Sequence, residues 1–243
     1  MKKLLWVITG AGYKMRATFD VILKLKEELG LKVTTALTRA GHEVARLYGV
    51  LDRLGHVSPG GYYEEVFVDD PLRPVSRLPG RVMTGSYDAI AIAPATANSV
   101  AKMALGIADT IATQVFSMAE KAGTPVVIMP SDGAEMVEAE LPCIIDAELC
   151  RACDECEPEE ACPSDAIFRT GDGRAHIDLS ICRGCEACVP LCPYKAISCW
   201  RTALIECRDI DRANVEKLRG REGVLIVLDE LGLYEAIRGL LMR

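Results

Sequence analysis

Two runs of cysteines carry the clearest chemistry in this 243-residue sequence. In each run three cysteines are spaced C-x2-C-x2-C, and a fourth cysteine followed by proline comes a few residues later. Thiolates so close along a chain turn toward a common centre and bind metal, so the repeat predicts two metal centres. The first run is Cys150, Cys153, Cys156 and Cys162, and the second is Cys182, Cys185, Cys188 and Cys192.

The second run, C-x2-C-x2-C-x3-C-P, resembles the iron–sulfur run of bacterial two-cluster ferredoxins, in which the last cysteine ligates the other cluster. The resemblance covers residues 144–200 and implies two 4Fe-4S clusters whose ligands cross between the runs. A zinc ribbon would use two C-x2-C pairs and would leave the third cysteine of each run and both Cys-Pro pairs unexplained. The implied ligand sets are Cys150, Cys153, Cys156 and Cys192 for one cluster and Cys182, Cys185, Cys188 and Cys162 for the other.

The other cysteines and the unequal spacing of the runs lead to two smaller expectations. The first run has two extra residues, within EPEEA, which we expect to lengthen a surface loop without moving a ligand. Three cysteines lie outside the ligand sets, and we interpret Cys143, Cys199 and Cys207 as small buried residues. Metal or redox chemistry explains eleven cysteines better than disulfides do, because the cytoplasm keeps thiols reduced.

The composition separates the cysteine segment from the rest of the chain. Residues 143–200 hold 11 Asp or Glu against 5 Lys or Arg, together with ten of the eleven cysteines. The formal net charge of -7 argues against a nucleic-acid partner. The first apolar run, Leu4–Ile8, is too short for a signal peptide or a membrane span. The sequence therefore predicts a cytoplasmic protein that binds neither nucleic acid nor membrane.

The N-terminal residues predict a strand, a glycine turn and a helix. KLLWVIT is almost entirely apolar, as in a strand buried on both faces, and Gly10-Ala11-Gly12 precedes a helical pattern over residues 14–29. Glycines let the backbone approach an anion, and the start of a helix offers free N–H groups. The turn thus predicts a phosphate site, although it lacks the third glycine of a dinucleotide fingerprint.

Strands and helices continue to alternate beyond this unit. We expect strands over 31–37, 87–95 and 125–130, each followed by a turn or a helix. This pattern predicts an α/β fold, a Rossmann-like (flavodoxin-like) parallel sheet with an inserted ferredoxin domain. Strand and helix patterns resume after Trp200, so we predict a flavoprotein domain formed by residues 1–143 and 201–243, with the ferredoxin inserted at 144–200.

One stretch, YDAIAIAPATANSVAKMALGIADTIAT from Tyr87, resembles the signature of the homo-oligomeric flavin-containing decarboxylase family, which includes the flavin prenyltransferases. The order of residues from Ala93 to Asn98 matches that signature residue for residue. The resemblance implies FMN, with its phosphate at the first glycine turn, and a homo-oligomer built on trimers. The FMN-binding residues implied are Gly10, Ala11, Gly12, Thr38, Arg39, Ala93, Pro94, Ala95, Thr96, Ala97, Asn98, Pro130, Ser131 and Asp132.

The decarboxylase machinery of that family is missing here. Its substrate clamp reads Pro-x-Met-Asn-x-x-Met-Trp, and this chain keeps only Pro130 and Met136 of it. The His-Ile-Glu-Leu segment that holds the family's catalytic histidine is absent. We interpret the three histidines as surface or capping residues: His42 on a helix, His56 in a glycine-rich loop and His176 in the ferredoxin segment.

A flavoprotein of this family with an inserted two-cluster ferredoxin resembles the archaeal dihydromethanopterin reductases over the whole chain. That resemblance implies an oxidoreductase that passes electrons from reduced ferredoxin or a similar donor through two 4Fe-4S clusters to FMN. The implied substrate is a pterin, 7,8-dihydromethanopterin, which is reduced to tetrahydromethanopterin.

The sequence does not show which residue is the acid that protonates the pterin. Ser131 and Asp132 follow a suitable strand, and Tyr62 and Tyr63 are candidates to stack on the pterin. Each of these four residues fits a solvated loop equally well. Two alternative functions remain open at this point. One is a non-catalytic flavoprotein electron carrier between redox proteins, and the other is a flavin-dependent decarboxylase or prenyltransferase-like enzyme.

Overall fold

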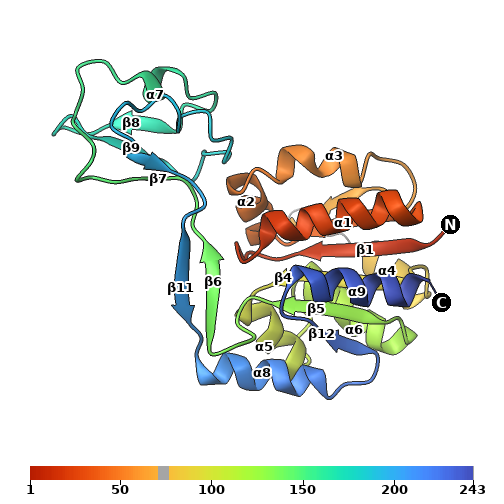
Figure 1. Cartoon of the computed structure of the whole chain (residues 1–243). Coiled ribbons are helices and arrows are strands. Elements are labelled where there is room, and N and C mark those ends of the chain that lie inside the picture. Colours follow the sequence, from red (N-terminus) through yellow and green to blue (C-terminus); the bar gives the residue numbers. More distant parts are fainter. Residues whose placement is uncertain (71–76, 243) are drawn as a thin grey trace.

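The computed structural model describes residues 1–70 and 77–242, and a six-stranded parallel sheet forms its centre (Figure 1). Its strands are β1 (Lys3–Ile8), β2 (Lys32–Leu37), β3 (Val66–Val68), β4 (Ala89–Ala95), β5 (Val126–Pro130) and β12 (Val224–Ile226). The strand order is β12-β5-β4-β1-β2-β3, the order of a doubly wound Rossmann sheet. The predicted parallel α/β fold is confirmed, and its topological switch point lies between β1 and β4.

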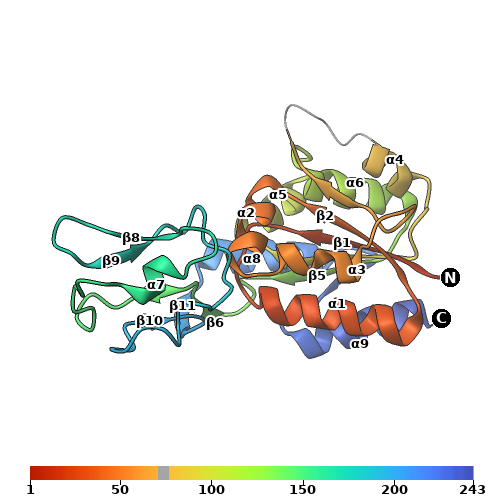
Figure 2. The same cartoon turned by 90° about the horizontal axis from the view of Figure 1, so that it is seen from above.

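Helices cover both faces of this sheet, because strands such as β1 bury both faces. Leu4 and Trp6 pack on one side, whereas Leu5 and Val7 pack on the other. One face holds α1 (Met15–Leu29), α2 (Arg39–Leu47), α3 (Leu54–Val57) and α9 (Glu230–Leu241), with the 3-10 turn η1 (Leu51–Arg53). The other face holds α4 (Arg77–Met83), α5 (Ala97–Leu105), α6 (Ile111–Ala122) and α8 (Asp209–Arg219). Figure 2 shows α1 and α9 on one side of the strands and α4, α5 and α6 on the other. We call the sheet with its helices the sheet lobe.

The core under α1 gives a stability prediction. The Phe19 ring is fully buried, with its centroid 6.3 Å from that of the buried Trp6. We expect Phe19→Ala to lower the free energy of unfolding of the sheet lobe by about 3 to 5 kcal/mol, because the truncation leaves a cavity. Glu27→Ala, at an exposed position of the same helix, is the matched control. Urea unfolding followed by circular dichroism checks both variants, and equal midpoints would contradict this description of the core.

A two-stranded antiparallel ribbon leaves the sheet lobe after β5. It pairs β6 (Met136–Glu140) with β11 (Thr202–Glu206) and leads to a smaller lobe, as Figure 1 shows. We call residues 144–198 the cysteine lobe. Its short elements are β7 (Ile144–Ile145), α7 (Glu157–Glu160), β8 (Ile167–Arg169), β9 (Ala175–Ile177) and β10 (Ile197–Ser198). The first strand after Trp200, β11, belongs to the ribbon and not to the central sheet.

The two halves of the cysteine lobe repeat one another in backbone structure as well as in sequence. The N–H of Asp146 donates to the carbonyl of Ala196 (2.8 Å), and the N–H of Asp178 donates to that of Ala166 (2.7 Å). Ala152 and Gly184, at equivalent places in the two runs, both have positive φ, of 49° and 59°. The duplicated segment thus builds two equivalent cysteine loops.

Two expectations about this region are wrong. Cys143 and Cys199 form a disulfide where the cysteine lobe joins the ribbon, although we expected no disulfides. They are cross-strand neighbours next to the pairing of β7 with β10, which places their Cα atoms 3.9 Å apart. The EPEE segment forms the helical turn α7 instead of a lengthened loop, because its proline occupies the start of a helix, where no N–H is needed. Among the described residues, no helix is long and apolar enough to cross a membrane.

Candidate functional site

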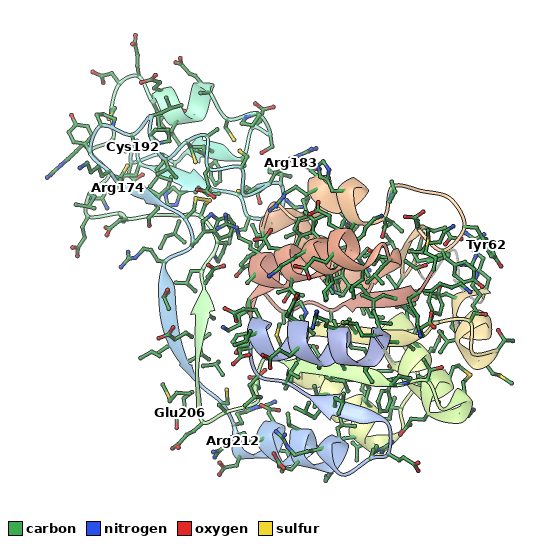
Figure 3. All side chains as sticks on the ribbon, turned by 45° about the vertical axis from the view of Figure 1, so that its right-hand side comes forward. Tyr62, Arg174, Arg183, Cys192, Glu206 and Arg212 are labelled. Carbon is green, nitrogen blue, oxygen red and sulfur yellow. A yellow bond between two sulfur atoms is a disulfide. The ribbon has the colours of Figure 1, made fainter. Side chains whose placement is uncertain are left out.

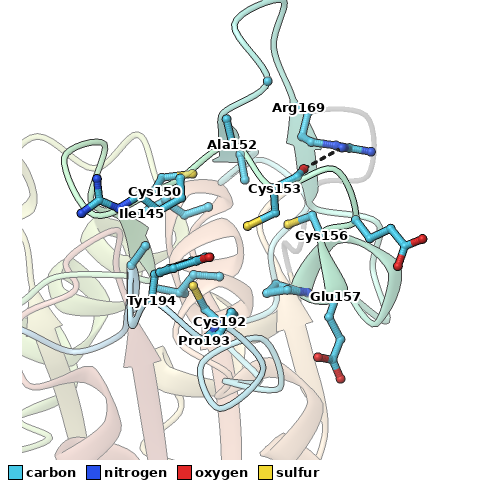
Figure 4. Close-up of a pocket in the computed structure, with 17 residues that line it drawn as sticks. Ile145, Cys150, Ala152, Cys153, Cys156, Glu157, Arg169, Cys192, Pro193 and Tyr194 are labelled. Carbon is cyan, nitrogen blue, oxygen red and sulfur yellow. Dashed lines mark hydrogen bonds between the residues drawn. The ribbon is translucent and has the colours of Figure 1, made fainter.

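The structure brings the cysteines of the two runs together in two pockets. The outer cysteine pocket, drawn in Figure 4, has walls that include Cys150, Cys153, Cys156 and Cys192. The inner cysteine pocket has walls that include Cys162, Cys182, Cys185 and Cys188. Each pocket therefore combines three cysteines of one run with the last cysteine of the other, which is the crossed arrangement that the ferredoxin resemblance implies.

A 4Fe-4S cluster and a single metal ion place different demands on the cysteines that bind them. Among the residues that the structure describes, no three side chains of His, Cys, Asp or Glu are arranged to hold one metal ion. Four thiolates at about 2.3 Å from one zinc would form such a group. In a 4Fe-4S cluster each cysteine binds a different iron, so the sulfurs lie farther apart. Each pocket brings together four cysteines, the number that a 4Fe-4S cluster requires.

Burial raises the pKa of the cysteine thiols, whereas hydrogen bonds from backbone N–H groups lower it. Burial raises the pKa of Cys188 to about 11, and it also raises the pKa of Cys182 and Cys156. Burial acts in the same direction on Cys162, but N–H groups that include that of Ala166, 3.3 Å from the sulfur, outweigh it and lower the pKa. Cluster assembly must therefore displace protons from the buried thiols of the inner pocket.

The crossed ligand sets predict which cluster a single substitution damages. Cys162→Ser is expected to disrupt the inner cluster and to remove about four of eight irons, because Cys162 lies with the second run. Iron and sulfide analysis with electron paramagnetic resonance measures the loss. Cys207→Ser, at a cysteine outside both pockets, is the control and should keep the full iron content. Damage confined to the cluster of the Cys150 run would contradict the crossed assignment.

A third pocket, the switch-point pocket of about 380 Å³, lies at the carboxyl ends of β1 and β4. Thr9, fully buried at the end of β1, ties the two strand ends together. Its hydroxyl donates to the carbonyl of Pro94 (2.9 Å) and accepts from the N–H of Thr96 (2.8 Å). These bonds fix the width of the crevice between the first glycine turn and the start of α5.

The switch-point pocket suits a phosphate ester with an aromatic ring system. Helices α1 and α5 both begin at it, and neither has an acidic residue in its first turn, so both present positive ends. Its volume lies within the range of about 300 to 1,000 Å³ that is usual for cofactor pockets. Tyr13 and Tyr48 supply aromatic walls, and the ribbon adds an apolar one. FMN therefore fits the residues present.

The structure places only part of the predicted FMN-binding set on this pocket. Eight of those residues line it: Gly10, Ala11, Gly12, Thr96, Ala97, Asn98, Ser131 and Asp132. Ala93, Pro94, Ala95 and Pro130 instead lie buried within β4 and β5. Thr38 caps α2 by accepting from the N–H of Gly41 (3.0 Å), and Arg39 forms an ion pair with Glu43 (3.7 Å). These six do not line the pocket.

Sequence reasoning missed the walls that come from outside the strand ends. Tyr13 donates from its hydroxyl to the carbonyl of Leu228 (2.7 Å), and Tyr48 donates to that of Glu140 on the ribbon (2.5 Å). The two tyrosines follow the glycine turn and end α2, and nothing local marks them as lining residues. The ribbon residues on the pocket are Val137, Ala139 and Glu140 of β6, Leu141 beyond it and Ile205 of β11.

The structure places Tyr62 and Tyr63, which we considered as a pterin platform, away from the switch-point pocket. The ammonium of Lys3, at the start of β1, lies 4.4 Å from the Tyr63 ring centroid, and that ring also packs on Tyr87, just before β4. Both tyrosines therefore lie at the amino ends of the strands, opposite the switch-point pocket. The glycine-rich loop that we expected around His56 is instead helix α3, and His176 lies in β9.

A pocket for FMN at the switch point, together with two four-cysteine pockets, defines the class of iron–sulfur flavoproteins. The model of the Flavoprotein family matches residues 1–143, and that of the 4Fe-4S binding domain matches residues 175–198. The chain is 37% identical to the dihydromethanopterin reductase (acceptor) of Methanosarcina mazei over 93% of its length and 95% of that protein. It belongs to the family of these reductases. The protein of the same name from Methanocaldococcus jannaschii is 41% identical over 69% of this chain and 68% of that one.

Solved structures share the fold. DmrB of Burkholderia xenovorans, determined in complex with FMN and described as a cubic protein cage for redox transfer, matches with a TM-score of 0.63 at 21% identity. The match covers 99% of this chain and 96% of that one. The FMN-dependent cysteine decarboxylase TvaF matches with a TM-score of 0.53 at 16% identity, over 100% and 99% of the two chains. The predicted flavoprotein fold is thereby confirmed.

Proposed function

We propose that this chain is a dihydromethanopterin reductase that draws electrons from reduced ferredoxin or a similar protein donor. The observation that carries the proposal is the presence, in one chain, of a switch-point pocket fit for FMN and two crossed four-cysteine pockets. The full-length likeness to reductases of that name supports the choice of substrate. Reduction of the pterin imine adds a hydride to carbon and a proton to nitrogen, and a pair of one-electron donors is oxidised.

When bound, the clusters supply one-electron transfer, and FMN turns those electrons into a hydride. The residues that we propose for FMN are the eight on the switch-point pocket, and those for the clusters are the eight pocket cysteines. Gly10 and Gly12 let the backbone approach the phosphate at the start of α1. The Tyr48 ring and the apolar ribbon residues exclude water from the opposite wall. No histidine is among the residues that line this pocket, which disfavours a histidine-dependent decarboxylase.

We further propose that the ferredoxin domain, residues 144–200, is inserted in a flavoprotein domain of residues 1–143 and 201–243. The pairing of β12 with β5 supports this division, because it returns the chain to the central sheet after the ribbon. We also propose a homo-oligomer built on trimers. A cubic cage, as DmrB is described, contains threefold axes, and Leu204 is 67% exposed on the ribbon, where another subunit would cover it.

An acceptor experiment tests the proposed reaction. The holoprotein is reduced without oxygen and mixed separately with 7,8-dihydromethanopterin, a quinone and oxidised ferredoxin, while flavin absorbance is followed. We expect the dihydropterin to reoxidise the flavin and to yield the tetrahydro product in equal amount. Reoxidation by ferredoxin alone, with no tetrahydropterin formed, would replace the reductase by an electron carrier.

A further inference from the structure

The cysteine lobe contacts the sheet lobe through the half that holds the inner pocket. The Arg46 guanidinium, on α2, donates to the carbonyl of Cys182 and, at 3.1 Å, to that of Leu179. On the same side, Arg183 lies 3.6 Å from Asp52. Figure 3 shows Arg183 between the lobes, whereas Cys192 and Arg174 lie on the outer side.

The backbones of the two lobes also meet directly at this contact. A Cβ atom built on Gly184, between Cys182 and Cys185, would lie 2.3 Å from the carbonyl oxygen of Leu47. Gly184 also has a φ of 59°, which disfavours any other residue. The loop of the inner pocket thus packs on the end of α2 with no side chain in between.

An aromatic pair joins this contact to the switch-point pocket. The Trp200 indole lies on the Tyr48 ring, with the centroids 5.2 Å apart, and Tyr48 lines the pocket. The indole N–H donates to Glu186 (2.5 Å), which lies between the inner-pocket residues Cys185 and Cys188. Arg16 of α1 lies 4.5 Å from the Trp200 ring centroid and 3.4 Å from the same carboxylate. Packed atoms therefore run from the inner pocket through Trp200 and Tyr48 to the switch-point pocket.

The outer pocket lies on the side of the cysteine lobe that faces solvent. Tyr194, one of its lining residues, is 49% exposed, and Phe168 nearby on β8 is 45% exposed. Electron tunnelling weakens steeply with distance and weakens more across gaps than through packed atoms. The inner pocket is therefore the better placed of the two for electron transfer to the flavin site, and the outer pocket is the better placed for contact with a donor in solution.

We propose that electrons enter at the outer pocket, pass to the inner pocket and cross to the flavin site at the Trp200–Tyr48 contact. This contact keeps the inner pocket on the side of the cysteine lobe that faces the sheet lobe. The inference rests on the proposed function and adds a direction to it. Each crossing oxidises the inner site by one electron and reduces the flavin site by one. Repeating the crossing, with protons from solvent, completes the reduction of FMN, and the reduced protein donor replaces the electrons.

Removing one cluster at a time tests this order. Cys188→Ala is expected to remove the inner cluster and Cys153→Ala the outer one, with FMN content unchanged in both. With reduced ferredoxin as the electron donor, the outer cluster of Cys188→Ala should gain and keep its paramagnetic signal while the flavin stays oxidised. A pulse of photochemical reductant is used for the other variant, because it reduces the inner cluster directly. In Cys153→Ala the inner cluster should reduce the flavin at the wild-type rate. The opposite pattern would overturn the proposed order.

Variants of Trp200 test the contact itself. Trp200→Leu should slow the transfer from inner cluster to flavin about tenfold or more, as loss of positioning does. It should also speed hydrogen exchange in residues 46–53 and 179–186, with cluster and FMN contents unchanged. Trp200→Phe should keep both properties, and Phe168→Leu, at the exposed aromatic on the outer side, is the control. Wild-type transfer and exchange in Trp200→Leu would refute the role of the contact.

These outcomes are independent of the substrate. Ordered transfer to the flavin with no product from dihydromethanopterin would reject the proposed reductase function and keep the electron path. Product formation from dihydromethanopterin, with electrons passing directly from the outer cluster to the flavin, would keep the proposed reductase function and reject the electron path.

Discussion

Cys185→Ala is expected to abolish reduction of dihydromethanopterin by a protein donor and to spare the same reaction when a small chemical reductant reduces the flavin. Cys185 lines the inner pocket, and its loss removes a cluster ligand. The switch-point pocket contains no residue of that loop, so FMN binding should persist. Anaerobic assays of product formed with each reductant, on protein whose FMN content has been measured, give the comparison.

Ala187→Ser is the matched control, because it changes an exposed residue of the same loop that ligates nothing. It should retain both activities. Loss of both activities in Cys185→Ala with FMN still bound would mean that the cysteine lobe shapes the substrate site. Retention of both would mean that the donor reaches the flavin without the clusters, and the role of the cysteine lobe as an electron path would be rejected.

Gly12→Ala is expected to weaken FMN binding strongly. A Cβ atom on Gly12 would lie 2.2 Å from the Tyr48 hydroxyl oxygen and 2.4 Å from its ring carbon Cζ. That ring cannot move freely, because its hydroxyl donates a hydrogen bond to the backbone carbonyl of Glu140 and the ring packs on Trp200. Overpacking of this kind costs about 1 to 3 kcal/mol, so the dissociation constant for FMN should rise about fivefold to about 150-fold.

Fluorescence titration of the flavin-free protein with FMN measures this change. Gly55→Ala is the control, since a Cβ atom there meets no atom within 4 Å. Unchanged FMN affinity in Gly12→Ala would show that the glycine turn does not border the flavin.

The sequence predicted most of the sheet lobe, because its strands and helices carry local signals. The apolar run of β1, the glycine turn and the helical pattern of α1 are contiguous, and the structure has them at Lys3–Ile8 and Met15–Leu29. The resemblance of the cysteine runs to those of two-cluster ferredoxins likewise predicted which cysteines share a pocket. The strand–turn–helix pattern and the cysteine spacing each lie within a short stretch of the sequence.

The ribbon, and the contacts that depend on it, could not be predicted from local sequence patterns. Pairing of β6 with β11 joins residues more than sixty positions apart, and neither strand shows which partner it takes. The apolar wall of the switch-point pocket, the disulfide of Cys143 with Cys199 and the Trp200–Tyr48 contact all depend on that pairing or on the contact between lobes. The position of Tyr62 and Tyr63 at the amino ends of the strands was not predicted for a related reason. The direction of the neighbouring strands decides which end of the sheet a loop reaches.

The central claim is that one chain holds two iron–sulfur clusters and a flavin, and cofactor content tests it most directly. Protein purified without oxygen should contain about eight iron and about eight acid-labile sulfide per chain, with about one FMN. Zinc without sulfide, or iron and sulfide without flavin, would contradict this account.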